Sequence, residues 1–329
     1  MNLRQVSLSI YSFGYAAGFL QDNRPEAAPP VVTIGNVADL ARQHGLGGIE
    51  FPVDRYFKVR ELDRAEAFIG GLLRDGMNVA VDLEHFDVPY IRAFLPVLSR
   101  QGLGFARIKM SSFYGGNRYL EARFADQVSD FVAALRSLLP ALRRQGIKLL
   151  IENHQDLGAE DLIRIIGATS ADCIGINWDI GNSLAVLDTP ETFLRKAGGF
   201  IGNVHLKDYR LCRCEKGFYL VRCALGEGVV EFTSLLAGLK EQQGPVPMAI
   251  ELGAQIARRA DVFEPAYLEA YRPHTAHGTD EFFAFLEARL RDGEEWKSLW
   301  ERNHPGWAII ESEKAEVIRS VAFLKGLAV

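Results

Sequence analysis

A short junction between two kinds of segment recurs along the chain. In HGLGGIEF (44–51), RDGMNVAV (74–81), RQGLGFAR (100–107) and RQGIKLLI (144–151), a polar or basic stretch meets a Gly and then a short apolar run. Gly often ends a helix because it adopts the left-handed conformation without strain. A short apolar run bounded by Gly is typical of a buried parallel strand. The repeated junction therefore predicts parallel strands that alternate with helices.

Eight apolar runs fit this pattern. We expect strands at 6–10, 48–51, 78–83, 105–110, 147–152, 174–178, 201–206 and 248–252. Eight strand–helix units favour a closed (β/α)8 TIM barrel over an open doubly wound sheet. A GxGxxG fingerprint follows none of these runs, which argues against a dinucleotide-binding fold.

Helix signals lie between the strands. The clearest is a set of apolar residues that repeat at intervals of three and four and precede Gly146, namely Val128, Phe131, Val132, Leu135, Leu138, Leu139 and Leu142. Asp63 and Glu66 have the spacing of a capping box at the start of an earlier helix.

The chain of 329 residues is expected to form one barrel domain, 1–329, with an insertion at 253–307. This segment separates the last strand from a final helix expected at 309–327, and it is too long for a normal strand–helix connection. Loops after barrel strands form the catalytic face, so we expect the insertion to cover the active site. Trp296 and Trp300 would then stack on a sugar, whereas a dimer interface is the alternative use of such aromatic residues.

Composition excludes several classes of protein. A net charge of −5 and a pI near 5.9 argue against a nucleic-acid-binding surface, and no apolar run is long enough for a membrane helix. No signal-peptide pattern opens the chain, and four cysteines do not make a disulfide framework, so a cytoplasmic protein is expected. Cys212, Cys214 and Cys223 have poor spacing for a zinc site, and a two-stranded excursion with reduced thiols is the preferred interpretation.

Four metal-type side chains stand at the ends of the last four predicted strands. They are Glu152, Asp179, His205 and Glu251, at spacings of 27, 26 and 46 residues. Adjacent strands lie about 4.8 Å apart, so the four side chains can converge on one divalent ion. Oxygen ligands with one imidazole and no thiol suit Mn²⁺, with Mg²⁺, Co²⁺ or Zn²⁺ as alternatives.

Five motifs around these residues occur in a characteristic order: IENH (151–154), NWDIGN (177–182), VHLKD (204–208), LGEGVVEF (225–232) and AIEL (249–252). Together they resemble the xylose isomerase-like barrels of the sugar phosphate isomerase/epimerase superfamily, which includes the ketose 3-epimerases. The resemblance implies that Glu152 and Glu251 act both as metal ligands and as an acid/base pair. A divalent ion bridging a carbonyl and the adjacent hydroxyl would make the C–H between them acidic.

The sequence departs from the epimerase pattern at two places. Asn182 stands where many ketose 3-epimerases have a substrate-binding His, and Lys207, Asp208 and Arg210 follow His205 in place of a Glu and an Arg. Nuclease relatives need further His ligands on earlier strands, and only His85 is available. These departures leave the identity of the sugar open.

Four residues are candidates for binding substrate: His85, Lys109, His154 and Lys207. Lys207 shares the inward parity of His205 on its strand, whereas Trp178 is expected to face the helices. A plain loop histidine is the alternative for His85, and for His154 the alternative is a side chain that points away from the pocket by alternation along its strand.

The sequence thus predicts a divalent-metal-dependent sugar isomerase or epimerase that transfers a proton through an enediolate. One alternative is a lyase that eliminates the C1 substituent of a 3-keto-glycoside, and another is a non-catalytic sugar- or metal-binding barrel. The expected partner is a small sugar, without nucleic acid or membrane, and the protein is expected to be a homo-oligomer.

Overall fold

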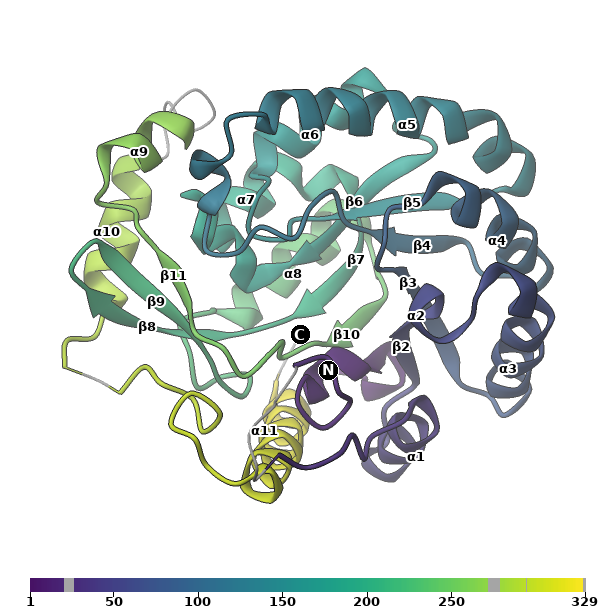
Figure 1. The fold of residues 1–329 in the computed structure, drawn as a ribbon, viewed down its shortest axis with the longest axis horizontal. Helices are drawn as coiled ribbons and strands as arrows, with labels where there is room; N and C mark the ends of the chain where they lie inside the picture. Colours follow the sequence, from purple (N-terminus) through teal and green to yellow (C-terminus); the bar gives the residue numbers. More distant parts are fainter. Residues whose placement is uncertain (21–26, 272–278, 294, 328–329) are drawn as a thin grey trace.

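The computed structural model describes residues 1–20, 27–271, 279–293 and 295–327. Eight parallel strands close into a barrel in the order β1-β10-β7-β6-β5-β4-β3-β2 (Figure 1). These strands are β1 (Val6–Ser9), β2 (Gly48–Pro52), β3 (Asn78–Leu83), β4 (Phe105–Ile108), β5 (Lys148–Glu152), β6 (Ile174–Asp179), β7 (Ile201–Leu206) and β10 (Met248–Ile250). The fold is the predicted (β/α)8 TIM barrel.

Helices follow the barrel strands and surround them. The main ones are α1 (Ile34–His44), α3 (Leu62–Arg74), α4 (Val88–Arg100), α5 (Phe124–Gln145), α6 (Ala159–Ala168), α7 (Pro190–Ala197), α8 (Phe232–Gln243) and α11 (Gly306–Gly326). A four-residue helix, α2 (Val53–Tyr56), precedes α3. No described helix is long and apolar enough to cross a membrane.

The predicted elements are present, with strand ends that differ by up to two residues, but the predicted capping box is wrong. Helix α3 begins at Leu62 with Glu61 at the cap position, and no side chain caps it. Glu66 instead pairs with Arg100 on α4 at 2.6 Å, so its carboxylate joins two helices rather than closing one. The junction glycines behave as expected, since Gly45 and Gly146 both adopt the left-handed conformation after their helices.

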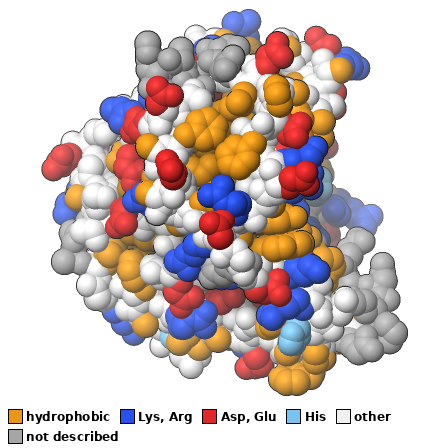
Figure 2. Space-filling view, turned by 90° about the vertical axis from the view of Figure 1, so that its left-hand side faces the viewer, with side chains coloured by type: hydrophobic (Ala, Val, Ile, Leu, Met, Phe, Trp, Pro, Cys, Tyr) orange, Lys and Arg blue, Asp and Glu red, His pale blue; other side chains and the backbone are white. Residues whose placement is uncertain are grey.

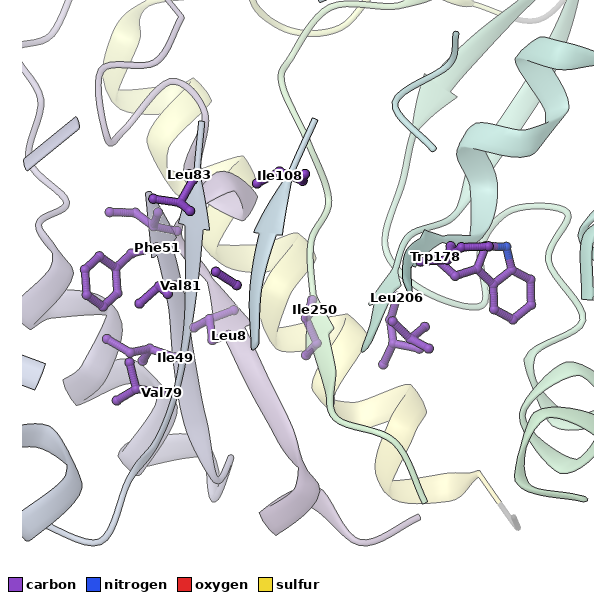
Figure 3. Packing of buried hydrophobic residues seen from close by; sticks show 14 of the residues in the cluster. Leu8, Ile49, Phe51, Val79, Val81, Leu83, Ile108, Trp178, Leu206 and Ile250 are labelled. Atoms are coloured by element: carbon purple, nitrogen blue, oxygen red, sulfur yellow. The ribbon is translucent and has the colours of Figure 1, made fainter. Parts of the chain in front are cut away.

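Side chains alternate along each barrel strand between two buried regions, the core between the strands and the helices and the inside of the barrel. Outward-facing side chains such as Ile49, Phe51 and Val81 belong to the large hydrophobic core between the strands and the helices (Figure 3). Trp178 also faces outward and stacks on Phe193 of α7, with ring centroids 5.8 Å apart, as its parity predicted. The residues of opposite parity fill the barrel, and many of them are polar or small: Ser7, Ser9, Glu50, Ala80, Asp82, Arg107, Asn177, Asn203 and Ala249.

A small extension lies beside the barrel. Strands β8 (Tyr209–Cys214) and β9 (Gly217–Arg222) form an antiparallel hairpin, which confirms the expected excursion after the seventh barrel strand. Strand β11 (Arg258–Ala260), which follows β10 in the chain, pairs with β9 and completes a sheet of order β11-β9-β8. This sheet and the helices α9 (Pro265–Tyr271) and α10 (Thr279–Arg289) share a second hydrophobic cluster.

The predicted insertion, 253–307, supplies β11, α9 and α10, while its residues 272–278 and 294 lie outside the described part of the chain. Hydrophobic side chains gather on the outer face of this extension, among charged ones (Figure 2). Phe263, with 42% of its surface exposed, stacks on Phe283. The expectation of a homo-oligomer stays a prediction.

Candidate active site

The four strand-end residues converge at the carboxyl-terminal mouth of the barrel. Glu152 ends β5, Asp179 ends β6, His205 lies on β7, and Glu251 follows β10. One ligand-type atom each from Glu152, Asp179 and His205 lie within 4.8 Å of one another. Glu50, His205 and Glu251 form a second such group, and all of these side chains are buried. His205 belongs to both groups and so joins them.

His205 lies between two carboxylates. Its Nε2 is 2.6 Å from Glu50 Oε1, and its Nδ1 is 2.9 Å from Glu251 Oε2. Burial alone would lower the pKa of His205, but the two carboxylates outweigh it and raise that pKa well above the usual value. Asn203 donates a hydrogen bond to Glu50 and so fixes the carboxylate that orients the imidazole.

Lys207 bridges the other side of the cluster. Its ammonium donates to Asp179 Oδ2 at 2.5 Å and to Glu251 Oε1 at 2.7 Å. Burial raises the pKa of Asp179 to about 7, although Lys207 lowers it. Burial also acts to raise the pKa of Glu251, but Lys207 and His205 hold it well below its usual range. Asn182, at the position where a His was expected from the epimerase pattern, donates to Asp179 Oδ2 at 2.7 Å.

Arg107 provides a second buried cation inside the barrel. Its Nε lies 3.0 Å from Asp82 Oδ1 on β3, and a terminal nitrogen lies 3.0 Å from Glu152 Oε2 on β5. Burial acts to raise the pKa of Glu152, but Arg107, with smaller contributions from His154 and His205, outweighs it and holds this pKa below its usual value. Arg107 therefore keeps Glu152 in its ionised form.

Glu50, Asp82 and Arg107 were not among the predicted site residues. Each is a charged side chain inside a short apolar strand, and such a group is rarely buried without a partner. Their inward parity, shared with Ser9 and Asn177 on other strands, is the signal that would have located them.

The donor set fits a divalent cation. Among the described residues, five buried carboxylates, those of Glu50, Asp82, Glu152, Asp179 and Glu251, outnumber the cations that contact them, which are Arg107, Lys207 and the protonated ring of His205. Asp179 Oδ1 is buried with no hydrogen-bond partner among the described residues. A bound divalent ion would balance this charge and would be coordinated by Asp179 Oδ1, with Glu152, His205 and Glu251 as further ligands.

A cavity of about 250 Å³ opens above the cluster. Glu152, Lys207 and Glu251 form part of its lining, and so do two predicted substrate-binding residues, Lys109 and His154. Burial lowers the pKa of His154 to about 3, so its imidazole is neutral. Its ring packs edge-on against Tyr114, with centroids 4.8 Å apart.

His85 does not line this cavity. Its ring is largely exposed, and its Nδ1 lies 2.9 Å from Asp54 Oδ2, which also accepts the backbone N–H of His85. Asp54 on α2 therefore turns His85 away from the barrel mouth, and the loop residue before it, Glu84, lines the cavity instead. The prediction of His85 as a substrate contact finds no support in this position.

The segment after β10 contributes to the cavity wall through its first residues, Gly253, Ala254, Ile256 and Arg258. The predicted stacking of Trp296 and Trp300 on substrate is wrong. Trp296 stacks on Tyr219 of β9, with centroids 4.1 Å apart and planes 6° from parallel. Trp300 is partly buried and packs against the main core.

Comparison with known proteins supports the barrel. A family model described as a xylose isomerase-like TIM barrel matches residues 101–265. A 3-oxo-isoapionate decarboxylase from Pectobacterium atrosepticum is 22% identical over 252 residues, which cover 75% of this chain and 84% of the relative.

Solved structures share the fold at low sequence identity. An L-ribulose 3-epimerase has a TM-score of 0.55 at 16% identity, with 97% of this chain and 95% of that chain covered. A 3-keto-D-glucoside 4-epimerase from E. coli has a TM-score of 0.52 at 15% identity, with 86% and 99% covered.

Proposed function

Because the chain belongs to the xylose isomerase-like TIM barrel family, whose matched relatives include enzymes that act on sugars, we propose that it is a metal-dependent sugar isomerase or epimerase. The reaction would move a proton at the carbon next to a carbonyl group. The observation that carries the proposal is the pair of buried, ionised carboxylates Glu152 and Glu251, which face one cavity from strands three places apart round the barrel.

Each carboxylate has its own cation. Arg107 holds Glu152 in the basic form, and Lys207 together with His205 holds Glu251 in the basic form. A carboxylate held ionised can accept a proton from a C–H bond, and a second carboxyl group across the substrate can return one. Proton removal on one face and return on the other inverts the carbon, whereas return to the neighbouring carbon gives an isomer.

Glu152, Asp179, His205 and Glu251 would hold a divalent ion, Mn²⁺ in our proposal. When bound, this ion would polarise the substrate carbonyl and stabilise the negative charge that forms as the proton leaves. Glu50 would keep the His205 ring in the orientation needed for binding, and Asn182 would fix the Asp179 carboxylate. The neutral ring of His154 and the ring of Tyr114 would offer the sugar two uncharged ring surfaces.

Isotope exchange tests the proposal. The Mn²⁺-loaded protein, incubated in D₂O with a panel of ketoses, sugar acids and 3-keto-glycosides, should place deuterium at the carbon next to the carbonyl without added nicotinamide cofactor. Glu152→Gln and Glu251→Gln should each slow exchange by about 100-fold or more, whereas Glu241→Gln, an exposed change on α8, should not. Full exchange by both site variants, or a strict need for a nicotinamide cofactor, would contradict the proposal. Binding of a panel member without any exchange would favour a non-catalytic barrel.

A lyase is the second candidate, favoured by the similarity to the decarboxylase over 75% of this chain. Proton removal at C2 of a 3-keto-glycoside gives an enolate, whose electron pair then expels the C1 substituent and leaves an enone. Loss of CO₂ from a 3-oxo acid leaves an enolate directly. Analysis of the products separates the two: a released leaving group indicates the lyase, and an isomer of unchanged mass indicates the isomerase or epimerase.

A further inference from the structure

Five cationic side chains line the central cavity, and three of them have carboxylate partners. Arg55 pairs with Glu84 at 3.3 Å, and Arg107 and Lys207 pair with the buried acids of the barrel mouth. The other two, Lys109 and Arg258, have no carboxylate oxygen within 4.0 Å in the part of the chain that the structure describes. Among the described residues, Lys109 and Arg258 therefore lack the close carboxylate partner that the other three cations of the cavity have.

Arg258 is held on the wall by stacking. It begins β11, and its guanidinium carbon lies 3.7 Å from the centroid of the Tyr114 ring. Tyr114 packs in turn against the ring of His154. A guanidinium stacked on a ring keeps its in-plane N–H donors available for a carboxylate or phosphate.

Lys109 stands on the same side of the cavity. It directly follows β4, it is half-buried, and β4 pairs with β5, the strand after which His154 lies. Lys109, Tyr114, His154 and Arg258 thus make up one part of the lining, which we call the cationic wall.

A half-buried cation without a counter-ion costs free energy, because water solvates it only partly. An anionic ligand would recover that cost and gain charge-assisted hydrogen bonds. We place the anion at the cationic wall and not at the barrel mouth, where Glu152, Asp179 and Glu251 would hold the metal ion. It must therefore be separated from the reacting carbonyl group.

We propose that the substrate is an anionic sugar derivative, a sugar acid or a sugar phosphate, whose carboxylate or phosphate binds Lys109 and Arg258. This inference rests on the proposed function only for placing the carbonyl group of the substrate at the carboxylate cluster. A neutral ketose would leave both half-buried cations without a counter-ion and would bind more weakly.

A matched set of probes tests the charge preference without turnover. Isothermal titration calorimetry with the full-length, Mn²⁺-loaded protein would compare D-fructose, D-fructuronate and D-fructose 6-phosphate, with inorganic phosphate as a direct probe of the wall. At least one anionic sugar should bind about tenfold or more tightly than D-fructose. A preference for D-fructuronate identifies a carboxylate as the natural group, and a preference for the phosphate ester identifies a phosphate.

Substitutions locate the effect. Arg258→Met and Lys109→Met should each weaken binding of the preferred anion about tenfold and leave that of D-fructose unchanged. Arg258→Lys should recover part of the loss. The control Arg259→Met changes the next residue of β11, whose side chain is half-exposed and pairs with Asp261, and Lys148→Met changes a lysine at the start of β5; both should bind like the unaltered protein.

Three results would overturn the inference: D-fructose binding as tightly as both anionic sugars, no binding of either anionic sugar or of phosphate, or equal weakening of all probes in Arg258→Met, which would show that Arg258 only supports Tyr114. Tight binding of an anion that exchanges no deuterium would leave this inference standing and contradict proton transfer. Deuterium exchange without any charge preference would do the reverse.

Discussion

The ammonium of Lys207 lies 2.7 Å from Glu251 Oε1, inside a buried cluster in which carboxylates outnumber fixed cations. The contact holds Glu251 ionised, and the second contact of Lys207, to Asp179, ties two neighbouring strand ends together. The same carboxylates are the ones that we propose as metal ligands. Lys207 and a divalent ion would therefore stabilise the same group of negative charges.

Removing Lys207 should make the fold depend on metal. Lys207→Met leaves Asp179 and Glu251 buried with less compensating charge, so the metal-free variant should lose about 3 kcal/mol of unfolding free energy. Mn²⁺ should restore a larger part of the stability in the variant than in the unaltered protein. Urea unfolding with and without Mn²⁺ measures both, with the exposed Lys216→Met as the control. Equal stability of the metal-free proteins would contradict this account.

The metal content of a ligand variant tests the proposed metal site. Asp179→Asn removes one carboxylate charge from the proposed ligand set and leaves a similar shape, so the metal content should fall from one ion per chain to well below half. Elemental analysis after dialysis against Mn²⁺ gives the occupancy. Asp172→Asn is the matched control, since Asp172 is exposed at the opposite end of β6. Full occupancy in both variants would remove Asp179 from the site.

Arg107 should be indispensable for the barrel interior. Arg107→Met leaves Asp82 and Glu152 buried without their shared partner, which should cost about 3–5 kcal/mol of unfolding free energy. The double variant Arg107→Met with Asp82→Asn should recover part of this loss, because one of the two uncompensated charges is gone. Chemical unfolding of the unaltered protein, of Arg107→Met, of Asp82→Asn and of the double variant gives the coupling, and additive losses would show that the ion pair has no special role.

Glu313 lies on α11, away from the candidate active site, and it should make the stability of the protein depend on pH. Its buried carboxylate on α11 accepts hydrogen bonds from the backbone N–H groups of Tyr15 and Ala16, each at 2.9 Å. Burial nevertheless raises the pKa of Glu313 to about 7, so the folded protein holds a proton that the unfolded chain releases near pH 4.3. Stability from this group is full below about pH 4.3 and is lost as the pH rises to about 7.

Glu313→Gln removes the titrating group. Relative to this variant, the unaltered protein should lose up to about 3 kcal/mol of unfolding free energy as the pH rises from 4.5 to 7.5. Urea unfolding across that range measures the shift, and the exposed Glu311→Gln serves as the control. A difference that does not change with pH would show that Glu313 stays ionised in the fold.

The sequence predicted the parts of the site that follow from position along a strand. Glu152, Asp179, His205 and Glu251 could be recognised because each ends an apolar run, and the parity of Lys207 placed it toward the cavity. Partners that meet only across the barrel were not recognisable. Arg107 pairs with residues on both neighbouring strands, and the strand register that brings these residues together cannot be inferred from the sequence of any one strand.

Loop conformation was the other limit. The outward turn of His85 depends on Asp54, which lies about thirty residues earlier and is held by a four-residue helix that gave no strong sequence signal. Trp296 likewise looked available for substrate until its stacking on Tyr219 was seen, because the two residues lie far apart in the chain. Parity does not hold within a loop, so neither side chain could be oriented from sequence.

The segment after β10 should divide into a cavity wall and a support. Ile256 lines the cavity, so Ile256→Ala should raise KM for the exchange reaction several-fold while changing stability by about 1 kcal/mol or less. Trp296 stacks on β9 outside the cavity, so Trp296→Ala should lower the unfolding free energy by about 1–3 kcal/mol and leave KM unchanged. Deuterium exchange kinetics and urea unfolding of both variants separate the two roles, with light scattering to record the mass. A raised KM in Trp296→Ala alone would restore the tryptophan as a substrate contact. A fall in mass in either variant, with KM unchanged, would assign the segment to assembly instead.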